Sequence, residues 1–258
     1  MSPKARPTRG SLLPVLGAFL LFFAAATVCS GEEFSAREIM RQMENRIRGR
    51  TNRGTMQMVV NTPNWRRDLT LKFWVAGDDR SLVKIMAPAK EAGIASLRIG
   101  SNMWNYLPKV ERTVKIPASM MMQSWMGGDF TNDDVMKATS FVSDYEHRVL
   151  KTETVDGQQI WLVESVPRPG TAVVWGKVLL RIGPDYLPRR EEFCDEKGRA
   201  VKVLEFSDFK IIGGRKFPGT WKMTPLNKKG CDTTLKYLEI EFDASIPEKV
   251  FSLANLKK

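Results

Sequence analysis

After residue 50 the chain reads as a succession of short strand-like segments joined by tight turns, with little helical pattern between them. Residues 69–75, LTLKFWV, place apolar side chains at every second position, as a half-buried strand does. The pair Asp156-Gly157 stands between two more such segments and favours a hairpin turn. Successive strands with tight turns and no connecting helices form an antiparallel meander.

We therefore expect one mainly β domain with about ten or eleven antiparallel strands. The chain also shows a hairpin signal at Pro108-Lys109, between the strand-like segments 103–107 and 112–116. A single sheet of this length must curl or close, because otherwise its apolar face stays in water. A curled sheet with a few helices over its open side satisfies that requirement.

A helix is predicted just before the first strand. Ser35 is an N-cap with Glu38 three residues on, as in a capping box, and Phe34 is placed to staple onto the first turn. The apolar face of this helix comprises Ile39, Met40, Met43 and Ile47. Arg46 and Arg48 suit its C-terminal end, where Gly49 can terminate it. Further helical signals lie at 133–137 and after Pro247.

The first thirty residues have the layout of a secretory signal peptide. Lys4, Arg6 and Arg9 precede an apolar run from Leu12 to Val28. We predict a signal peptide at 1–30 and a single domain at 31–258, which places the protein in the periplasm. An uncleaved membrane anchor is the alternative, because the run approaches the ~20 residues that span a bilayer. Lipidation of Cys29 is a third interpretation.

The formal net charge of +11 falls to +8 when the three cations of the leader are removed. A basic surface on an exported protein suits anionic membrane lipids or an acidic partner better than nucleic acid. An ordinary lysine-rich surface is the alternative.

Two cysteines remain once Cys29 leaves with the signal peptide. Cys194 and Cys231 could pair in an oxidising compartment. The sequence does not show whether their Cα atoms lie within the ~7 Å that a disulfide requires.

Signals of catalysis are weak along the whole chain. His147 is the single histidine, and neither a CxxC nor an HExxH motif is present. No GxSxG elbow accompanies it, so we expect a structural role for His147. The aspartates of DFTNDD (129–134) lack the spacing of a calcium loop and favour a capped helix start. We predict no catalytic residue, no metal site and no cofactor, and a hydrolase is the weakest of the functional alternatives.

The segment ASMMMQSWM (118–126) is unusually rich in soft apolar side chains. On a helical wheel, one arc contains Met121, Met122, Trp125 and Met126. A short helix packed on the sheet is one interpretation. The other is a lid over an apolar cavity, because methionine adapts to ligands of variable shape. In that case Gly127 and Gly128 would be the hinge.

The blocks MWNYLP, RTVKI and SWMGGDFTNDD within residues 103–134 resemble the LolA-like family of outer-membrane lipoprotein-sorting proteins. The resemblance extends from the first helix to VFSLANL near the end. It implies an incomplete, strongly curved antiparallel β-barrel with helices at its mouth. It also implies an apolar interior that holds acyl chains of lipids or lipoproteins. The family's arginine that reaches from a strand to the lid could correspond to Arg66, Arg67 or Arg112.

The resemblance makes a non-enzymatic periplasmic carrier the leading prediction. Its partners would be acyl chains, a transient membrane surface and an inner-membrane exporter of the RND type or an outer-membrane acceptor. The candidate lipid-binding residues at the cavity mouth are Met121, Met122, Trp125, Met126, Trp104 and Tyr106. Either Phe73 or Trp74 faces the cavity, because neighbours in a strand point to opposite sides. The alternative function is a stationary accessory subunit of an RND-type lipid exporter.

Overall fold

The computed structural model describes residues 35–137, 141–171 and 173–257. The expected signal peptide at 1–30 and the expected staple residue Phe34 lie outside these residues. Residues from 34 onward form one compact unit.

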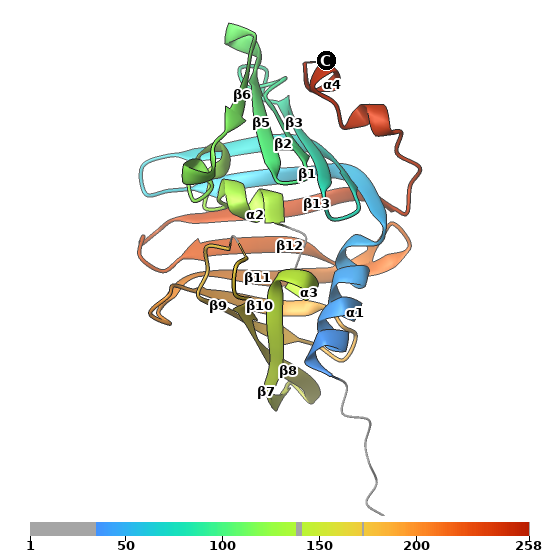
Figure 1. Ribbon diagram of the computed structural model, residues 1–258, viewed down its shortest axis with the longest axis vertical. Coiled ribbons are helices and arrows are strands. Elements are labelled where there is room, and N and C mark those ends of the chain that lie inside the picture. Colours follow the sequence, from blue (N-terminus) through green and yellow to red (C-terminus); the bar gives the residue numbers. More distant parts are fainter. Residues whose placement is uncertain (1–34, 138–140, 172, 258) are drawn as a thin grey trace, which may run out of the picture. The chain divides into compact units, whose positions relative to one another are not determined.

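The main element is a thirteen-stranded antiparallel sheet (Figure 1). Its strands are β1 (Thr51–Asn61), β2 (Arg66–Ala76), β3 (Arg80–Ala87), β4 (Ala95–Ile99), β5 (Asn102–Leu107), β6 (Arg112–Ile116), β7 (Tyr145–Val155), β8 (Gln158–Pro167), β9 (Lys177–Ile182), β10 (Pro188–Cys194), β11 (Ala200–Ile212), β12 (Arg215–Pro225) and β13 (Asp232–Phe242). Their spatial order is β6-β5-β4-β3-β2-β1-β13-β12-β11-β10-β9-β8-β7. Two meanders therefore meet where β1 pairs with β13, and the described strands leave β6 and β7 as the two edges.

This architecture confirms the predicted mainly β, incompletely closed and curved sheet. The described residues contain more strands than the ten or eleven expected, and β4 was absent from the segments identified in the sequence. The predicted hairpins are present. Asp156 and Gly157 both have positive φ, as a two-residue turn between β7 and β8 requires. At the other hairpin, a 3-10 turn η1 (Pro108–Val110) joins β5 to β6.

The helices are short: α1 (Ala36–Arg48), α2 (Asn132–Lys137), α3 (Phe141–Asp144) and α4 (Leu253–Leu256), with 3-10 turns η2 (Ala118–Met120), η3 (Trp125–Gly127) and η4 (Glu248–Val250). In Figure 1, α1, α2 and α3 lie in front of the strands. Helix α1 packs against both β12 and β7, although four strands separate those two in the sheet order. The sheet must therefore curl around α1.

Helix α1 begins and ends where the sequence predicts. The Ser35 side chain accepts a hydrogen bond from the Glu38 amide at 3.3 Å, and the Gly49 amide donates to the Asn45 carbonyl at 3.0 Å. The Glu38 carboxylate accepts from Arg41 and Gln42 on the next turn. The predicted apolar face is turned inward, with Ile39, Met40 and Met43 fully buried.

Two apolar clusters form on opposite faces of the sheet. The larger one lies on the concave face, where α1 and the segment 125–130 pack. The smaller one lies at β3, β4 and β5 and includes Leu82, Leu97, Phe251 and Leu256. The C-terminal η4 and α4 therefore cover this end of the sheet from its other face.

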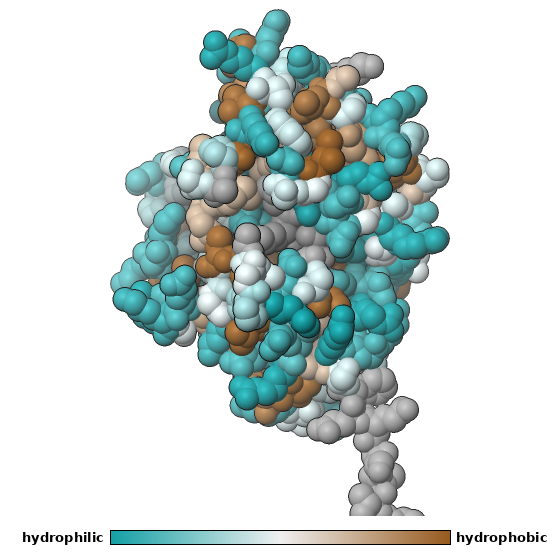
Figure 2. Space-filling view, viewed as in Figure 1, coloured by the Kyte–Doolittle hydropathy of each residue, from teal (hydrophilic) through white to brown (hydrophobic). Residues whose placement is uncertain are grey.

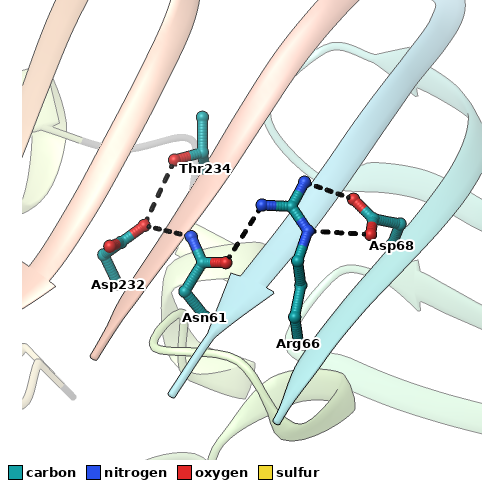
Figure 3. A network of polar contacts seen from close by, with 5 residues as sticks. All are labelled: Asn61, Arg66, Asp68, Asp232 and Thr234. Atoms are coloured by element: carbon teal, nitrogen blue, oxygen red, sulfur yellow. Dashed lines mark hydrogen bonds and ion pairs between the residues drawn. The ribbon is translucent and has the colours of Figure 1, made fainter. Parts of the chain in front are cut away.

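A polar network connects the ends of the three adjacent strands β2, β1 and β13 (Figure 3). Asn61 of β1 donates to Asp232 of β13 at 3.0 Å and accepts from Arg66 of β2 at 3.3 Å. Arg66 also pairs with Asp68, and Thr234 donates to Asp232. Such exposed pairs contribute at most about 1 kcal/mol each. Their main effect is to favour one register at the junction of the two meanders.

Candidate functional site

A cavity of about 260 Å³ lies between the concave face of the sheet and the helices. Its wall is mostly apolar and comes from elements far apart in the sequence. The apolar lining residues are Met43, Ile47, Met56, Phe73, Val75, Val83, Trp125, Phe130, Trp175, Pro188, Phe193, Leu204, Phe206, Phe217, Trp221, Met223, Leu235, Ile240 and Phe242. A site of this kind offers contact area to an apolar ligand and few fixed hydrogen bonds.

Aromatic rings form much of the floor. Phe217, Trp221 and Tyr237 have ring centroids 5.0 to 5.9 Å apart, on the adjacent strands β12 and β13. Phe73 joins them, at 5.7 Å from Tyr237. Of the two neighbours in β2, Phe73 lines the cavity, whereas Trp74 packs against the smaller cluster on the other face.

The methionine-rich segment is not a continuous helix, which corrects the wheel-based interpretation. It consists of the separate 3-10 turns η2 and η3, and Met126 within η3 has a positive φ of 51°. Backbone bonds explain the break. The Trp125 amide donates to the Phe130 carbonyl at 2.7 Å, and the Asn132 amide donates to the Gln123 carbonyl at 2.9 Å. Residues 123–132 therefore form a closed loop, here called the cap loop, that leads into α2.

The cap loop contributes Trp125 to the cavity wall. Trp125 is 3% exposed and its indole Nε1 donates to the Ser96 hydroxyl at 3.0 Å. Ser96 in turn donates to Asn105 at 2.7 Å, so β4 and β5 hold the indole in one orientation. Trp125 is thus fixed by both packing and hydrogen bonding.

Arg67 ties the cap loop to the sheet. It lies in β2 and donates from Nη1 to the Met126 carbonyl at 2.7 Å. The same guanidinium pairs with Glu91, which is largely buried. Among Arg66, Arg67 and Arg112, Arg67 is therefore the one that reaches from a strand to the methionine-rich segment. Arg66 instead pairs with Asp68 in its own strand.

The other predicted mouth residues are distributed over several places. Met121 and Met126 are half-buried against the larger cluster, and Met122 is exposed. Trp104 and Tyr106 pack against the smaller cluster on the opposite face, and neither is among the lining residues of the cavity. The structure thus brings Trp125, but not Trp104 or Tyr106, into the cavity wall.

The glycine pair is held by close contacts. Gly127 has a positive φ of 76°. Gly128 is buried, and a Cβ there would stand 2.5 Å from Met58 Cε and 3.1 Å from the Thr233 hydroxyl. A larger residue at 128 would therefore require the Met58 side chain to move. The proposed hinge role of the glycine pair stays a prediction.

Cys194 and Cys231 are both free thiols in the structure. Cys194 is buried at the end of β10, and Cys231 precedes β13. The strands β11 and β12 lie between them in the sheet.

His147 on β7 lies with Nδ1 2.8 Å from the buried Ser165 hydroxyl. Within the described residues, no group of three or more histidine, cysteine or acidic side chains is placed to hold a metal ion.

Several charged side chains line this mostly apolar cavity, and no motif in the sequence pointed to them. At one end, Asp134 of α2 pairs with Lys202 of β11, and Glu191 of β10 lies beside them. Lys202 Nζ stands 4.6 Å from the centre of the Trp175 ring. Burial, with the charge of Asp134, raises the pKa of Glu191 to about 8, and the charge of Lys202 opposes that rise.

At another part of the wall, Arg48 of α1 and Arg98 of β4 line the cavity. Burial lowers the pKa of Arg48 to about 10. The sequence interpretation assigned Arg48 only to the C-terminal end of the helix, where a cation suits the helix dipole. A helical wheel gives no signal for this position, because Arg48 lies about 180° from the buried Ile39.

Comparisons with known proteins place this fold in a family. A family model described as "Uncharacterized protein" matches residues 77–258, more than two thirds of the chain. A search of curated proteins found no match. Within the described residues, no helix has the length and apolar character needed to cross a membrane.

Solved structures give the same architecture. A LolA superfamily protein from Nitrosomonas europaea is 23% identical, with a TM-score of 0.74 over 86% of this chain and 99% of that one. A putative outer membrane lipoprotein-sorting protein domain from Vibrio parahaemolyticus is 24% identical, with a TM-score of 0.75 over 86% and 98%. A DUF1329 family protein from Desulfovibrio piger is 21% identical, with a TM-score of 0.79 over 86% and 97%.

The fold is therefore that of the LolA superfamily and of DUF1329 proteins, as the resemblance implied. The chain itself belongs to the family of uncharacterized proteins whose model it matches.

Proposed function

We propose that this protein binds acyl chains of lipids or lipoproteins in its cavity and carries them through the periplasm towards the outer membrane. The observation that carries the proposal is the cavity of about 260 Å³ with its largely apolar and aromatic wall. The similarity in fold to a lipoprotein-sorting protein domain supports it. Binding and release, without a chemical step, are the whole of the proposed activity.

The energetics suit a carrier. Burying an acyl chain of about fourteen methylenes is worth roughly 10 kcal/mol at ~0.8 kcal/mol each. Leaving a membrane forfeits a similar amount, so small differences between donor and acceptor set the direction of transfer. The Arg67 bond to the cap loop is one contact whose making or breaking would shift that balance.

The β5–β6 hairpin supports contact with a membrane surface. Leu107, Val110 and Val114 are exposed on it, and the same hairpin carries Lys109, Arg112 and Lys115. Figure 2 shows hydrophobic and hydrophilic residues side by side over this end of the molecule. Exposed apolar side chains among cations match the interfacial region of an anionic bilayer. We call residues 107–116 the basic tip.

The test fills the cavity and measures uptake. Val75 and Val83 both line the cavity, from β2 and β3. The double change Val75→Phe with Val83→Phe puts two rings into the space an acyl chain would take. We expect uptake of a fluorescent fatty acyl probe to weaken by about 10-fold or more, as the loss of several buried methylene contacts implies.

The matched control is Lys72→Phe, an exposed position on β2. Circular dichroism establishes that each variant is folded. Undiminished uptake by the folded double variant contradicts binding in this cavity. Native mass spectrometry of the parent gives a second measurement, in which a lipid-sized adduct supports the carrier. A protein without lipid that co-purifies with an exporter instead supports a stationary accessory subunit.

A further inference from the structure

Two guanidinium groups line the cavity without a carboxylate partner in hydrogen-bond contact among the described residues. Arg48 comes from the last turn of α1, and Arg98 comes from β4, more than forty residues later. Ser96 and Arg98 share a face of β4, because residues two apart in a strand point the same way. The fold therefore brings both arginines to a cavity whose other walls are mostly apolar.

Arg48 lacks the partners that a buried guanidinium normally has. Its Nη1 is shielded from solvent and has no hydrogen-bond partner in the structure. Neither Arg48 nor Arg98 forms an ion pair within 4.0 Å with any described carboxylate. Arg98 donates from Nε to the Gly100 carbonyl at 2.9 Å, which leaves its Nη groups for other partners. Buried charged donors are almost always satisfied, so an unsatisfied one in a cavity indicates a ligand group.

The surrounding charges do not neutralise this pair by contact. Glu44 and Asp144 lie on the cavity wall, and Asp78 and Asp79 lie in the exposed turn between β2 and β3. Their charges raise the pKa of one arginine or the other, but burial is the larger effect and lowers both. Burial raises the pKa of Tyr237, and the nearby charge of Arg48 opposes that rise.

We propose that Arg48 and Arg98 form a headgroup site within the cavity, which binds the carboxylate or phosphate of an acyl amphiphile whose chain lies along the aromatic floor. This inference rests on the proposed acyl-chain binding and adds the chemical class of the ligand. Two guanidinium groups offer the planar, multiply donating geometry that carboxylate and phosphate oxygens match. An anion there would satisfy Arg48 Nη1 and complete the hydrogen bonding of the site.

The opposite charge pattern in the rest of the cavity gives the ligand a direction. Asp133, Asp134 and Glu191 line the wall near the cap loop and α2. Lys202 there already pairs with Asp134. This end of the cavity thus offers an anion only carboxyl groups and a lysine that is already paired, whereas the arginines attract it. The chain then extends from the α1 and β4 wall across Phe73, Tyr237 and Phe217.

The test compares amphiphiles that differ only in their headgroup. Hexadecanoic acid and 1-hexadecanol have the same chain, and at about pH 8 a carboxylic acid with an ordinary pKa is ionised. Competition against a fluorescent acyl probe gives both dissociation constants. We expect the parent protein to bind the acid about 10- to 100-fold more tightly, the value of a hydrogen-bonded charge. Comparing hexadecyl phosphate with the acid identifies the preferred headgroup. Inorganic phosphate alone shows how much of the binding needs no chain.

Arg48→Met and Arg98→Met retain an apolar stem and remove the charge. Each is expected to bring the ratio of acid to alcohol affinity towards one without weakening the binding of the alcohol. Arg46→Met is the matched control, because Arg46 is exposed on the same helix. It should leave the ratio unchanged.

The outcomes separate this inference from the proposed function. Equal affinity for acid and alcohol in the parent, or an unchanged ratio in both cavity variants, overturns the headgroup site while acyl binding stands. Failure of the parent to bind either amphiphile overturns the proposed function and this inference with it. Inorganic phosphate that competes as strongly as hexadecyl phosphate also overturns it, because the chain then contributes nothing.

Discussion

At the scale of single residues, the cavity combines an apolar wall with ionisable groups that are costly to bury. Lys202 is 4% exposed, and its ammonium is compensated by Asp134 and by the faces of Trp175 and Phe193. Glu191, 7% exposed, has no comparable compensation. A buried carboxyl group in such a position favours its neutral form. The stability of the protein should therefore depend on the protonation of Glu191.

The sign of this dependence follows from the raised pKa. Glu191 titrates near 8 in the folded protein, against a usual value of 4.5. The stabilising contribution of the protonated Glu191 carboxyl group is fully present below about pH 4.5 and is lost as the pH rises to about 8. Each pKa unit corresponds to about 1.4 kcal/mol, so the loss is on the order of a few kcal/mol.

Glu191→Gln should remove this loss. Thermal unfolding measured from pH 5 to pH 9 should show a flatter profile for the variant, and greater stability than the parent above about pH 8. The control is Glu192→Gln, at the half-exposed next position of β10, where the carboxylate pairs with Arg190. Parallel profiles for the parent and Glu191→Gln would show that Glu191 does not titrate in this range.

A close backbone contact gives a second prediction for a single residue. Gly54 lies beside the register shift in β1 opposite β13, and a Cβ there would stand 2.0 Å from the Glu239 carbonyl oxygen. Gly54→Ala should lower the free energy of unfolding by about 1–3 kcal/mol or more. Thr55→Ala is the control at the next position. Equal denaturation midpoints for the two variants would exclude the steric explanation.

At the scale of elements, strands and hairpins could be predicted better than the cap loop. Alternation in 69–75 and the Asp156-Gly157 turn are local signals, and the structure contains both elements. Strand β4 is only five residues long, and Arg98 and the buried Ser96 interrupt its apolar pattern. The sequence therefore gives it no strong signal.

The cap loop depends on bonds between residues that a local pattern does not connect. The wheel of residues 118–126 assumed helical geometry, whereas the backbone bonds from Trp125 to Phe130 and from Asn132 to Gln123 fold the segment back. Of the candidate mouth residues, Trp125 could be predicted from the sequence because it is a large apolar side chain. The presence of Arg48 and Arg98 in one cavity could not, because it depends on how β4 and α1 meet in three dimensions.

The Arg67 contact predicts how tightly the cap loop is held. Arg67→Met removes a charged hydrogen bond to the Met126 carbonyl, worth about 1.5–3 kcal/mol. Amide hydrogen exchange at Trp125 and Gly128 should then become about 10- to 100-fold faster.

Arg66→Met is the matched control for that change, because the exposed Arg66 is adjacent in β2 and pairs with Asp68. Exchange in the cap loop that is as slow in Arg67→Met as in Arg66→Met would show that the contact does not hold the loop.

At the scale of the whole molecule, one sheet has to bury its concave face and protect its two edges. The curl around α1 accomplishes the first of these. The edge strands β6 and β7 are mostly exposed and carry charges, which opposes pairing with another sheet edge. Both edge hairpins also expose apolar side chains. The basic tip at β5–β6 adds three cations to them, against the single carboxylate of Glu111.

The proposed membrane contact can be tested by comparing these two edges. In the basic tip, Val110 and Val114 are 59% and 43% exposed; on β7, Leu150 and Val155 are 41% and 46% exposed. Val110→Glu with Val114→Glu should weaken binding to vesicles of anionic phospholipid by about 10-fold or more, because insertion of each side chain is worth on the order of 1 kcal/mol and the new charges are repelled. Binding of the parent should also weaken with added salt.

Leu150→Glu with Val155→Glu adds the same charge at the other edge and should change vesicle binding much less. Equal losses in co-sedimentation for the two double variants would show that net charge, and not the basic tip, determines the contact.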